Sequence, residues 1–519
     1  MRIAFFIIAA LASVVVSAGC ENNAEGEEKL DLSVLTPSYP FNSGFYNPIK
    51  TNKNLGDPWM MRHTDGLYYY SGGAINIFSS PTISGFIGYD AIGARKKNVL
   101  ADIAPPDMRE IWAPEVHHYN GRWYVFFTAT HGGVNGSRER RENRRSYVLR
   151  SLSDDAFGEW EFRGQLDLPE GQWAIDPTFL EHKGKLYCIW SGWKDPTEGI
   201  GVHRQRLYIT ELEDGDPSKV KAGSRRVEIA NPTLDWEIHG NPVNEGPCIV
   251  KSPKGTVFCI YSASLSTTNN YRLGYLKLVG DDPMDPSNWW KNPNAIFEQN
   301  STYDVYGPGH NSVVTSPDGT EYWMIFHTAK QNNAGWDRHA RAQRLYWEGE
   351  DENTPSMKAG ATGVTYPDPL YQMQPIPSGE PAPSRLLFEA EDMVLDNTTL
   401  INLPAAHARN GRPARAVKLN TPSSSITMGV IIEEGGYYSV QLRHSNYTNV
   451  EQEFHLYLNG SPYFAIFRGS RSGASASSTF TMDAAAVILL KGLNTLKFTA
   501  STGMDVDCVI LERMDRHPW

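Results

Sequence analysis

DPWMMRHTDGLYYYSGG, residues 57–73, joins a short apolar segment to an aromatic-rich segment through the turn glycine Gly66. The same arrangement returns four times further along the chain, as APEVHHYNGRWYVFFTAT (113–130), DPTFLEHKGKLYCIWSGW (176–193), EGPCIVKSPKGTVFCIYSAS (245–264) and GHNSVVTSPDGTEYWMIFHTA (309–329). Consecutive turn glycines lie 55 to 71 residues apart. A regular period of strand, turn and strand is typical of a repeat architecture, and here it predicts a five-bladed β-propeller.

Acidic residues lead three of the five copies. Asp57, Asp176 and Glu245 each stand beside Pro or Gly at the entrance of the first strand. In a propeller the first strand of every blade lines the central channel, so equivalent positions converge on one pocket. A single Asp before Pro is best explained as a turn cap, but three acids in register across the repeat favour a shared functional site.

The composition is that of a soluble globular protein with an acidic balance. The 519 residues carry a formal net charge of −11, which argues against a nucleic acid or an anionic membrane surface as the partner. The basic run RERRENRR at 138–145 alternates with Glu and follows a Gly-rich stretch, which indicates a solvated loop. Fourteen Trp and 25 Tyr are many, and such flat aromatic faces suit both blade packing and stacking on sugar rings.

The N-terminus reads as a processing signal. Arg2 precedes an apolar run that ends in VSAGC at 16–20, which resembles a bacterial lipobox. Residues 1–20 would then be a lipoprotein signal peptide, Cys20 the lipid-modified residue and 21–44 a tether to the cell envelope. An ordinary secretory cleavage near Ala18 is the alternative.

The rest of the chain divides into two parts, both predicted to be all-β. Residues 45–376 form the propeller, and a Pro-rich linker at 377–385 leads to residues 386–519. In this last part, short alternating strands separated by turn residues predict a β-sandwich of the jelly-roll type. Three of the remaining four cysteines lie in apolar strands of the repeats, where they are expected to fill the blades rather than pair, and no metal-ligand spacing of Cys or His appears.

Three carboxyl groups in one pocket suit the hydrolysis of a glycosidic bond with inversion. One carboxylate activates a water molecule and one carboxylic acid protonates the leaving oxygen, and the two groups lie roughly 6.5–9.5 Å apart to leave room for that water. A third acid can position the general acid and raise its pKa by like-charge repulsion. The residues alone do not say which of the three takes which role.

The five repeats, taken in order, resemble the successive signatures of family 43 glycoside hydrolases, which are inverting enzymes on a five-bladed propeller. The resemblance implies that Asp57 is the general base, Glu245 the general acid and Asp176 the residue that orients and tunes that acid. It further implies substrate contacts for Trp112 in IWAPE, His310 in GPGHNS and Arg338 in DRHARAQRLYW. An ion near His310 in the channel is also implied, whereas Glu115 is assigned a structural role.

The closest subset of that family acts on α-L-arabinofuranosides, often exo-acting on arabinan. The expected activity is therefore removal of terminal α-L-arabinofuranosyl residues from plant polysaccharides or oligosaccharides, with no cofactor required for the chemistry. A β-xylosidase, another exo-acting member and a non-catalytic sugar-binding lipoprotein remain alternatives. The membrane would be reached only through the N-terminal lipid.

FEAEDMVL (388–395) and DVDCVILER (505–513) resemble the opening and closing strands of carbohydrate-binding modules of families 6 and 35. The resemblance implies that Glu389, Glu391 and Asp507 hold a structural calcium ion through oxygen ligands. This segment has no Trp before Trp519, so a structural appendage that has lost sugar binding is the alternative.

Overall fold

The computed structural model describes residues 35–42, 44–49, 56–72, 75–86, 95–131, 143–170, 173–195, 204–300, 305–330, 332–349, 354–357, 373–403, 408–409, 411–446, 452–469, 480–500 and 504–514. Within these ranges the regular structure consists of strands and the short 3-10 helices η2 (Ser84–Phe86), η3 (Asp235–Glu237), η4 (Pro286–Asn288) and η6 (Ala390–Asp392). This confirms the all-β prediction. The expected lipobox and most of the basic run lie outside the described residues. In the part of the chain that is described, no helix has the length and apolar character needed to cross a membrane.

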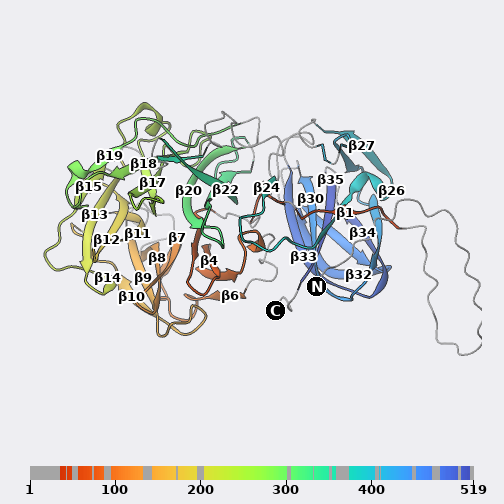
Figure 1. Cartoon of the computed structure of the whole chain (residues 1–519), viewed down its shortest axis with the longest axis horizontal. Helices are drawn as coiled ribbons and strands as arrows, with labels where there is room; N and C mark the ends of the chain where they lie inside the picture. Colours follow the sequence, from red (N-terminus) through yellow and green to blue (C-terminus); the bar gives the residue numbers. More distant parts are fainter. Residues whose placement is uncertain are drawn as a thin grey trace, which may run out of the picture.

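Residues 59–356 form five antiparallel sheets, each built from consecutive strands (Figure 1). The strands of the first two blades are β3 (Trp59–Arg62), β4 (Tyr68–Gly72), β5 (Asn76–Ser80) and β6 (Arg95–Asn98), then β7 (Met108–Tyr119), β8 (Arg122–His131), β9 (Arg144–Ser151) and β10 (Trp160–Gln165). The third blade holds β11 (Ala174–His182), β12 (Lys185–Gly192), β13 (Arg206–Glu213), β14 (Asp216–Val220) and β15 (Val227–Ala230). The last two hold β16 (Asn244–Lys251), β17 (Val257–Ala263), β18 (Arg272–Leu278) and β19 (Trp289–Lys291), then β20 (Tyr306–Thr315), β21 (Tyr322–Ala329), β22 (Arg338–Glu348) and β23 (Thr354–Ser356).

The first strands of the five blades close into a ring. Strands β3, β7, β11, β16 and β20 each pack against the next, and β20 returns to β3. Large side chains from the second strands fill the spaces between neighbouring blades, among them Trp123, Trp190, Tyr261 and Phe326, all at most 1% exposed. The five aromatic-rich repeats are therefore the five blades, and the propeller prediction is confirmed.

The segment before the first blade closes the propeller onto its last blade. Strand β2 (Gly44–Tyr46) pairs with β24 (Met373–Pro375), which follows the fifth blade. The side-chain amide of Asn47 donates to the carbonyl of Ala342 at 2.8 Å and accepts the amide of the same residue at 2.9 Å. Asn47 thus imitates a strand partner for β22 and holds the two ends of the propeller together.

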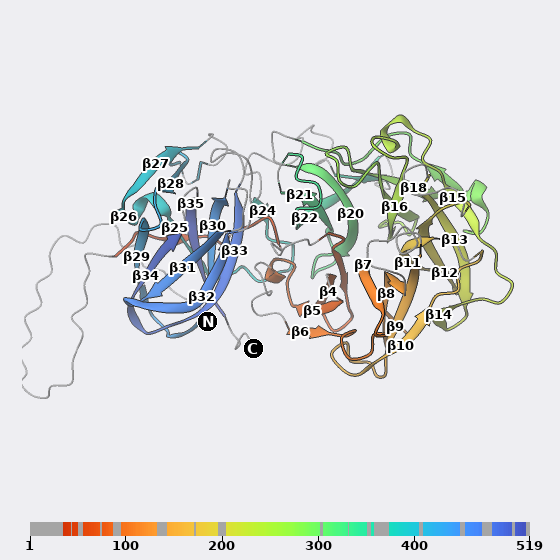
Figure 2. The same ribbon diagram turned by 180° about the vertical axis from the view of Figure 1, so that it is seen from behind.

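Residues 385–514 form a sandwich of two antiparallel sheets, seen beside the propeller in Figures 1 and 2. One sheet contains β1 (Tyr39–Pro40), β25 (Arg385–Glu389), β27 (Thr398–Asn402), β28 (Arg415–Leu419), β30 (Gly436–Asn446), β33 (Thr481–Leu489) and β35 (Met504–Arg513). The other contains β26 (Val394–Asp396), β29 (Ser425–Ile432), β31 (Gln452–Leu458), β32 (Ser461–Gly469) and β34 (Gly492–Ala500). Their facing apolar side chains form one core, as expected for such a sandwich.

The N-terminal segment differs from its prediction as part of a tether. Tyr39 and Pro40 pair with β25, and Leu35 forms a bridge with Gly429, so residues 35–40 belong to the sandwich. The outer face of the sheet that holds them packs on the propeller, because Leu387, Cys508 and Ile510 share one buried cluster with Tyr68 and Trp323. The described end of this segment therefore adds a strand to the sandwich and then enters the propeller.

Candidate active site

A left-handed residue lies in the first half of β7, β11, β16 and β20 and two residues before β3. Asp57, Ala113, Asp176, Gly246 and His310 have φ angles between 42° and 58°, and a Pro or Asn follows each of them. In β7, β11, β16 and β20 the pairing register shifts at this point, which is the signature of a β-bulge. Bulges re-aim side chains, so these residues leave the pleat of the sheet and turn toward the channel.

The positions of these left-handed residues correct the alignment of the fourth repeat. Asp57 and Asp176 occupy the same position in their blades, as the sequence indicated. The fourth copy places Gly246 there, and Glu245 stands one residue earlier. Glycine is required because a Cβ on Gly246 would lie only 3.0 Å from Nδ1 of His310. The acid of the fourth blade therefore enters the site from a different backbone position than the two aspartates.

A polar residue on each second strand holds the bulge of the next blade. Thr128 accepts the backbone amide of Asp176 at 3.0 Å, and Ser262 accepts that of His310 at 2.7 Å. Ser71 donates to the carbonyl of Pro114 and accepts the amide of Val116. Ser191 donates to the carbonyl of Asn244, and His327 accepts the amide of Asp57 at 3.0 Å. All five are fully buried. They form a closed ring of contacts that fixes the backbone beneath the carboxylates.

The three predicted acids line one cavity of about 680 Å³. Trp112 and His310, for which the resemblance implies substrate contacts, line it as well. Its other aromatic walls are Trp336 and the pair Trp173 and Trp193, whose rings stack with centroids 4.5 Å apart. Trp112 is 38% exposed and lies against the guanidinium of Arg144, with 3.8 Å from Cζ to the ring centroid. A compact, aromatic-walled pocket with converging carboxyl groups has the form of a small-molecule site.

Glu245 is held by two hydrogen bonds that the sequence did not predict. Nε2 of Gln205 donates to one carboxyl oxygen at 3.0 Å, and the hydroxyl of Tyr271 donates to the other at 2.9 Å. Burial, together with the nearby carboxyl of Asp176, raises the pKa of Glu245 to about 7. Glu245 is thus fixed in orientation and can carry a proton at neutral pH.

Asp176 interacts electrostatically with both other acids. Burial and the neighbouring charge of Asp57 raise the pKa of Asp176. One of its oxygens accepts the backbone amide of Gly246 at 3.1 Å, directly beside Glu245. Because Asp176 contacts the backbone that carries Glu245, it can influence both the position and the proton affinity of that residue.

Asp57 is flanked by two histidines. Nδ1 of His310 lies 3.1 Å from its carboxylate, and Nδ1 of His327 lies 3.9 Å away. Burial holds the pKa of His327 well below its usual range, so the ring is neutral and its Nδ1 can accept the amide of Asp57. The Asp57 carboxylate therefore has a fixed backbone and a fixed side-chain partner.

Two other predicted residues lie away from the cavity. The Arg338 side chain is completely buried and donates to the carbonyl oxygens of Ser266 at 2.7 Å and of Gly307, so it supports the wall rather than lining it. Glu115 is also buried, 3.1 Å from Nε2 of His117, in keeping with a structural role. Among the described residues His310 belongs to no group of three converging side-chain ligands.

The carboxylates expected to bind calcium in the sandwich face arginines instead. Arg409 forms ion pairs with both Glu389 and Asp507, the latter at 2.7 Å, and Arg443 forms a second ion pair with Asp507. These neighbours hold the pKa of Asp507 well below its usual range. Glu391 lies 3.9 Å from Arg412 and does not complete a set of oxygen ligands with the other two. Guanidinium groups occupy the place of a cation, so this donor set does not fit calcium.

Arg409→Ala is expected to lower the free energy of unfolding by about 3–5 kcal/mol, because it leaves two buried carboxylates with one cation fewer. The side chains of Arg409, Glu389 and Asp507 are at most 10% exposed, so solvent screens these pairs little. Arg412→Ala is the matched control: that arginine is 39% exposed and pairs with Asp392, and its loss should cost at most about 1 kcal/mol. Calorimetric unfolding of both variants measures the difference. Equal stability of the two, or a clear gain in stability of the unaltered chain on addition of Ca²⁺, would contradict this assignment.

Comparison with known proteins gives a consistent result. The sequence model described as Glycosyl hydrolases family 43 matches residues 45–352. Two relatives named "Extracellular exo-alpha-(1->5)-L-arabinofuranosidase", from Streptomyces avermitilis and Streptomyces chartreusis, are each 31% identical, over 62% and 54% of this chain. These alignments span 65% and 82% of the relatives' own lengths. The solved structure of an alpha-L-arabinofuranosidase from Lactobacillus brevis is 28% identical with a TM-score of 0.52, and it covers 62% of this chain and 98% of its own.

Proposed function

The chain belongs to family 43 of the glycosyl hydrolases, and from this premise we propose that it removes terminal α-L-arabinofuranosyl residues from plant polysaccharides or oligosaccharides with inversion at the anomeric carbon. The names of its relatives support the sugar, since those from two Streptomyces species are exo-acting arabinofuranosidases. The observation that carries the chemistry is the shared cavity of Asp57, Asp176 and Glu245. Enzymes of this family need no cofactor for the reaction.

In the proposed reaction Glu245 gives its proton to the glycosidic oxygen as the bond to the anomeric carbon breaks. A water molecule on the opposite face of the sugar attacks that carbon and gives a proton to Asp57. The raised pKa of Glu245 and its two fixed hydrogen bonds suit the acid. The contact between Asp57 and Nδ1 of His310 suits a carboxylate held in one orientation.

Asp176 acts on Glu245 in this proposal rather than on the substrate. Its charge disfavours ionisation of the acid, and its hydrogen bond to Gly246 fixes the adjoining backbone. Trp112 and Trp336, 38% and 45% exposed, offer flat faces for the apolar side of a furanose ring.

We further propose that the enzyme works outside the cytoplasm. The relatives from both Streptomyces species are named extracellular, and VSAGC at 16–20 supports a lipid anchor on the envelope. Labelling with a radioactive fatty acid, compared between the unaltered chain and Cys20→Ser, tests the anchor separately from the activity. If neither the unaltered chain nor Cys20→Ser is labelled and both are released into the medium, the protein is secreted without a lipid anchor.

The test of the activity is release of 4-nitrophenol from its α-L-arabinofuranoside and its β-D-xyloside by the purified protein. Turnover of the arabinoside with the β-anomer as the first product, seen by proton NMR, is the expected result. Preference for the xyloside would assign a β-xylosidase. No turnover of either, nor of arabino-oligosaccharides, would favour a sugar-binding protein.

The pH dependence of kcat/KM is expected to report Glu245. The acid must be protonated to act, so kcat/KM should fall tenfold per pH unit above a pH of about 7. The hydrogen bond from Tyr271 lowers the pKa of Glu245, so Tyr271→Phe should raise that pKa and move the alkaline limb to higher pH. Tyr275→Phe, on the following strand and outside the cavity lining, is the control and should leave the limb in place. A shift to lower pH in Tyr271→Phe would contradict the assignment.

A further inference from the structure

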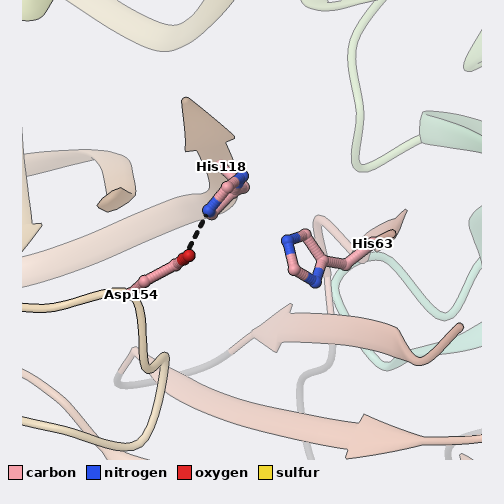
Figure 3. Close-up of side chains that lie close together, drawn as sticks. All are labelled: His63, His118 and Asp154. Carbon is pink, nitrogen blue, oxygen red and sulfur yellow. Dashed lines mark hydrogen bonds and ion pairs between the residues drawn. The ribbon is translucent and has the colours of Figure 1, made fainter. Parts of the chain in front are cut away.

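A second cluster of functional side chains lies at the other end of β3. Asp57 precedes this strand and His63 follows it, so the two are separated by about 20 Å of extended chain. His63 belongs to the first blade, whereas His118, on β7, and Asp154, in the turn after β9, belong to the second. Figure 3 shows the His63 ring facing the His118 and Asp154 pair across the seam between the blades.

The donor atoms of these three side chains nearly converge. Nε2 of His118 lies 2.7 Å from Oδ1 of Asp154, and one ligand atom from each of the three residues lies within 4.8 Å of the others. Ligands around a tetrahedral zinc ion stand about 3.3 Å apart, given bonds of about 2.0–2.1 Å. The Asp154 side chain is 61% exposed, so rotation of this residue can close the remaining gap.

The surroundings fix both imidazoles. The ring of Trp123 packs against His63 at 4.8 Å and against His118 at 4.9 Å between centroids. The two histidine rings meet edge to face at 4.4 Å. Both histidines are thus held on an aromatic base with little freedom left to lose on binding an ion.

A carboxylate behind His63 completes the arrangement. Oδ1 of Asp65 lies 3.2 Å from Nδ1 of His63. Asp65 is itself held by the backbone amide of Leu67 and the hydroxyl of Tyr69, both at 2.8 Å. Histidines that bind metals usually donate their second ring N–H to such a carboxylate, which leaves the Nε2 lone pair for the ion. With an ion on Nε2 of His63, the proton would be on Nδ1 and would be donated to the Asp65 carboxylate, in place of the present bond from the Asp65 backbone amide to Nδ1 at 3.4 Å.

We propose that His63, His118 and Asp154 form a transition-metal site that clamps the first blade to the second. Two imidazoles and one carboxylate suit Zn²⁺ and similar divalent ions, with one position open to water. Because the site is at the far end of β3 from Asp57, the ion would act on stability and would leave hydrolysis unchanged.

Calorimetric titration of the untagged, EDTA-treated chain with Zn²⁺ tests the proposal. One equivalent of Zn²⁺ should bind, and the affinity should fall at least tenfold in His118→Ala and in Asp154→Asn. Asp154→Asn alters only an exposed side chain, so it separates loss of binding from loss of folding. His131→Ala is the matched control, since His131 forms an exposed pair with Asp107 at 2.9 Å and, among the described residues, belongs to no group of three converging ligands. It should bind Zn²⁺ like the unaltered chain.

Thermal unfolding gives a second readout. Saturating Zn²⁺ should raise the Tm of the unaltered chain and of His131→Ala, and it should leave the Tm of His118→Ala and Asp154→Asn unchanged. Absence of stoichiometric binding, or equal affinity in all variants, would overturn the proposal. The glycosidase assay does not enter either measurement, so the outcome is independent of the proposed function.

Discussion

Glu245→Gln is expected to lower kcat/KM on natural arabino-oligosaccharides by about 10²–10⁴-fold, which is the usual contribution of a general acid. Glutamine keeps the shape of the side chain, and its carbonyl oxygen can still accept from Gln205 or Tyr271. What it lacks is a proton that can be transferred to the glycosidic oxygen. The loss should therefore appear in turnover, with the fold and the cavity preserved.

The leaving group separates this role from a structural one. A natural sugar leaves as a strongly basic alkoxide and depends on the acid, whereas 4-nitrophenolate leaves with little help. Glu245→Gln should retain far more activity on the 4-nitrophenyl arabinofuranoside than on an oligosaccharide, and its alkaline pH limb should disappear. Equal losses on both substrates would mean that the substitution damaged the site, and wild-type turnover would remove the acid assignment.

The blades were predictable from the sequence because their signals are local. Each copy carries its turn glycine and its run of buried aromatics within about twenty residues, and these decide strand, turn and packing together. The polar residue after each aromatic run was visible too, as Ser71, Thr128, Ser191, Ser262 and His327. Each of these side chains bonds to the backbone of the next blade, so its role in holding the bulge is recognised only in the three-dimensional structure.

The details of the site required the three-dimensional arrangement. The offset of Glu245 has a mark in the sequence, because Pro247 follows Gly246 as Pro58 follows Asp57, but the close approach of Gly246 to His310 has none. Gln205 and Tyr271 lie outside the five repeats, so no periodicity pointed to them. The motif around Arg338 implied a substrate contact, but the guanidinium of Arg338 donates to the backbone carbonyls of Ser266 and Gly307. In the sandwich, the arginines that replace a calcium ion come from segments remote from both acidic strands.

Asp57→Asn is expected to lower kcat/KM by about 10²–10⁴-fold on every substrate, including the 4-nitrophenyl glycoside. An amide cannot accept the proton of the attacking water, and that step is needed whatever the leaving group is. The substitution is nearly isosteric. Asn also tolerates the left-handed conformation, with φ of 58°, that this position adopts, so the backbone bond to His327 should persist.

The contrast between the two variants is the decisive measurement. If Asp57 is the base and Glu245 the acid, only Glu245→Gln should recover activity as the leaving group improves. Ser71→Ala, which removes one second-strand hydroxyl outside the cavity lining, is a control for general disturbance of the ring and should not reproduce either pattern. A leaving-group dependence in Asp57→Asn that matches the one in Glu245→Gln would show that the two carboxyl groups do not divide the roles of base and acid as proposed.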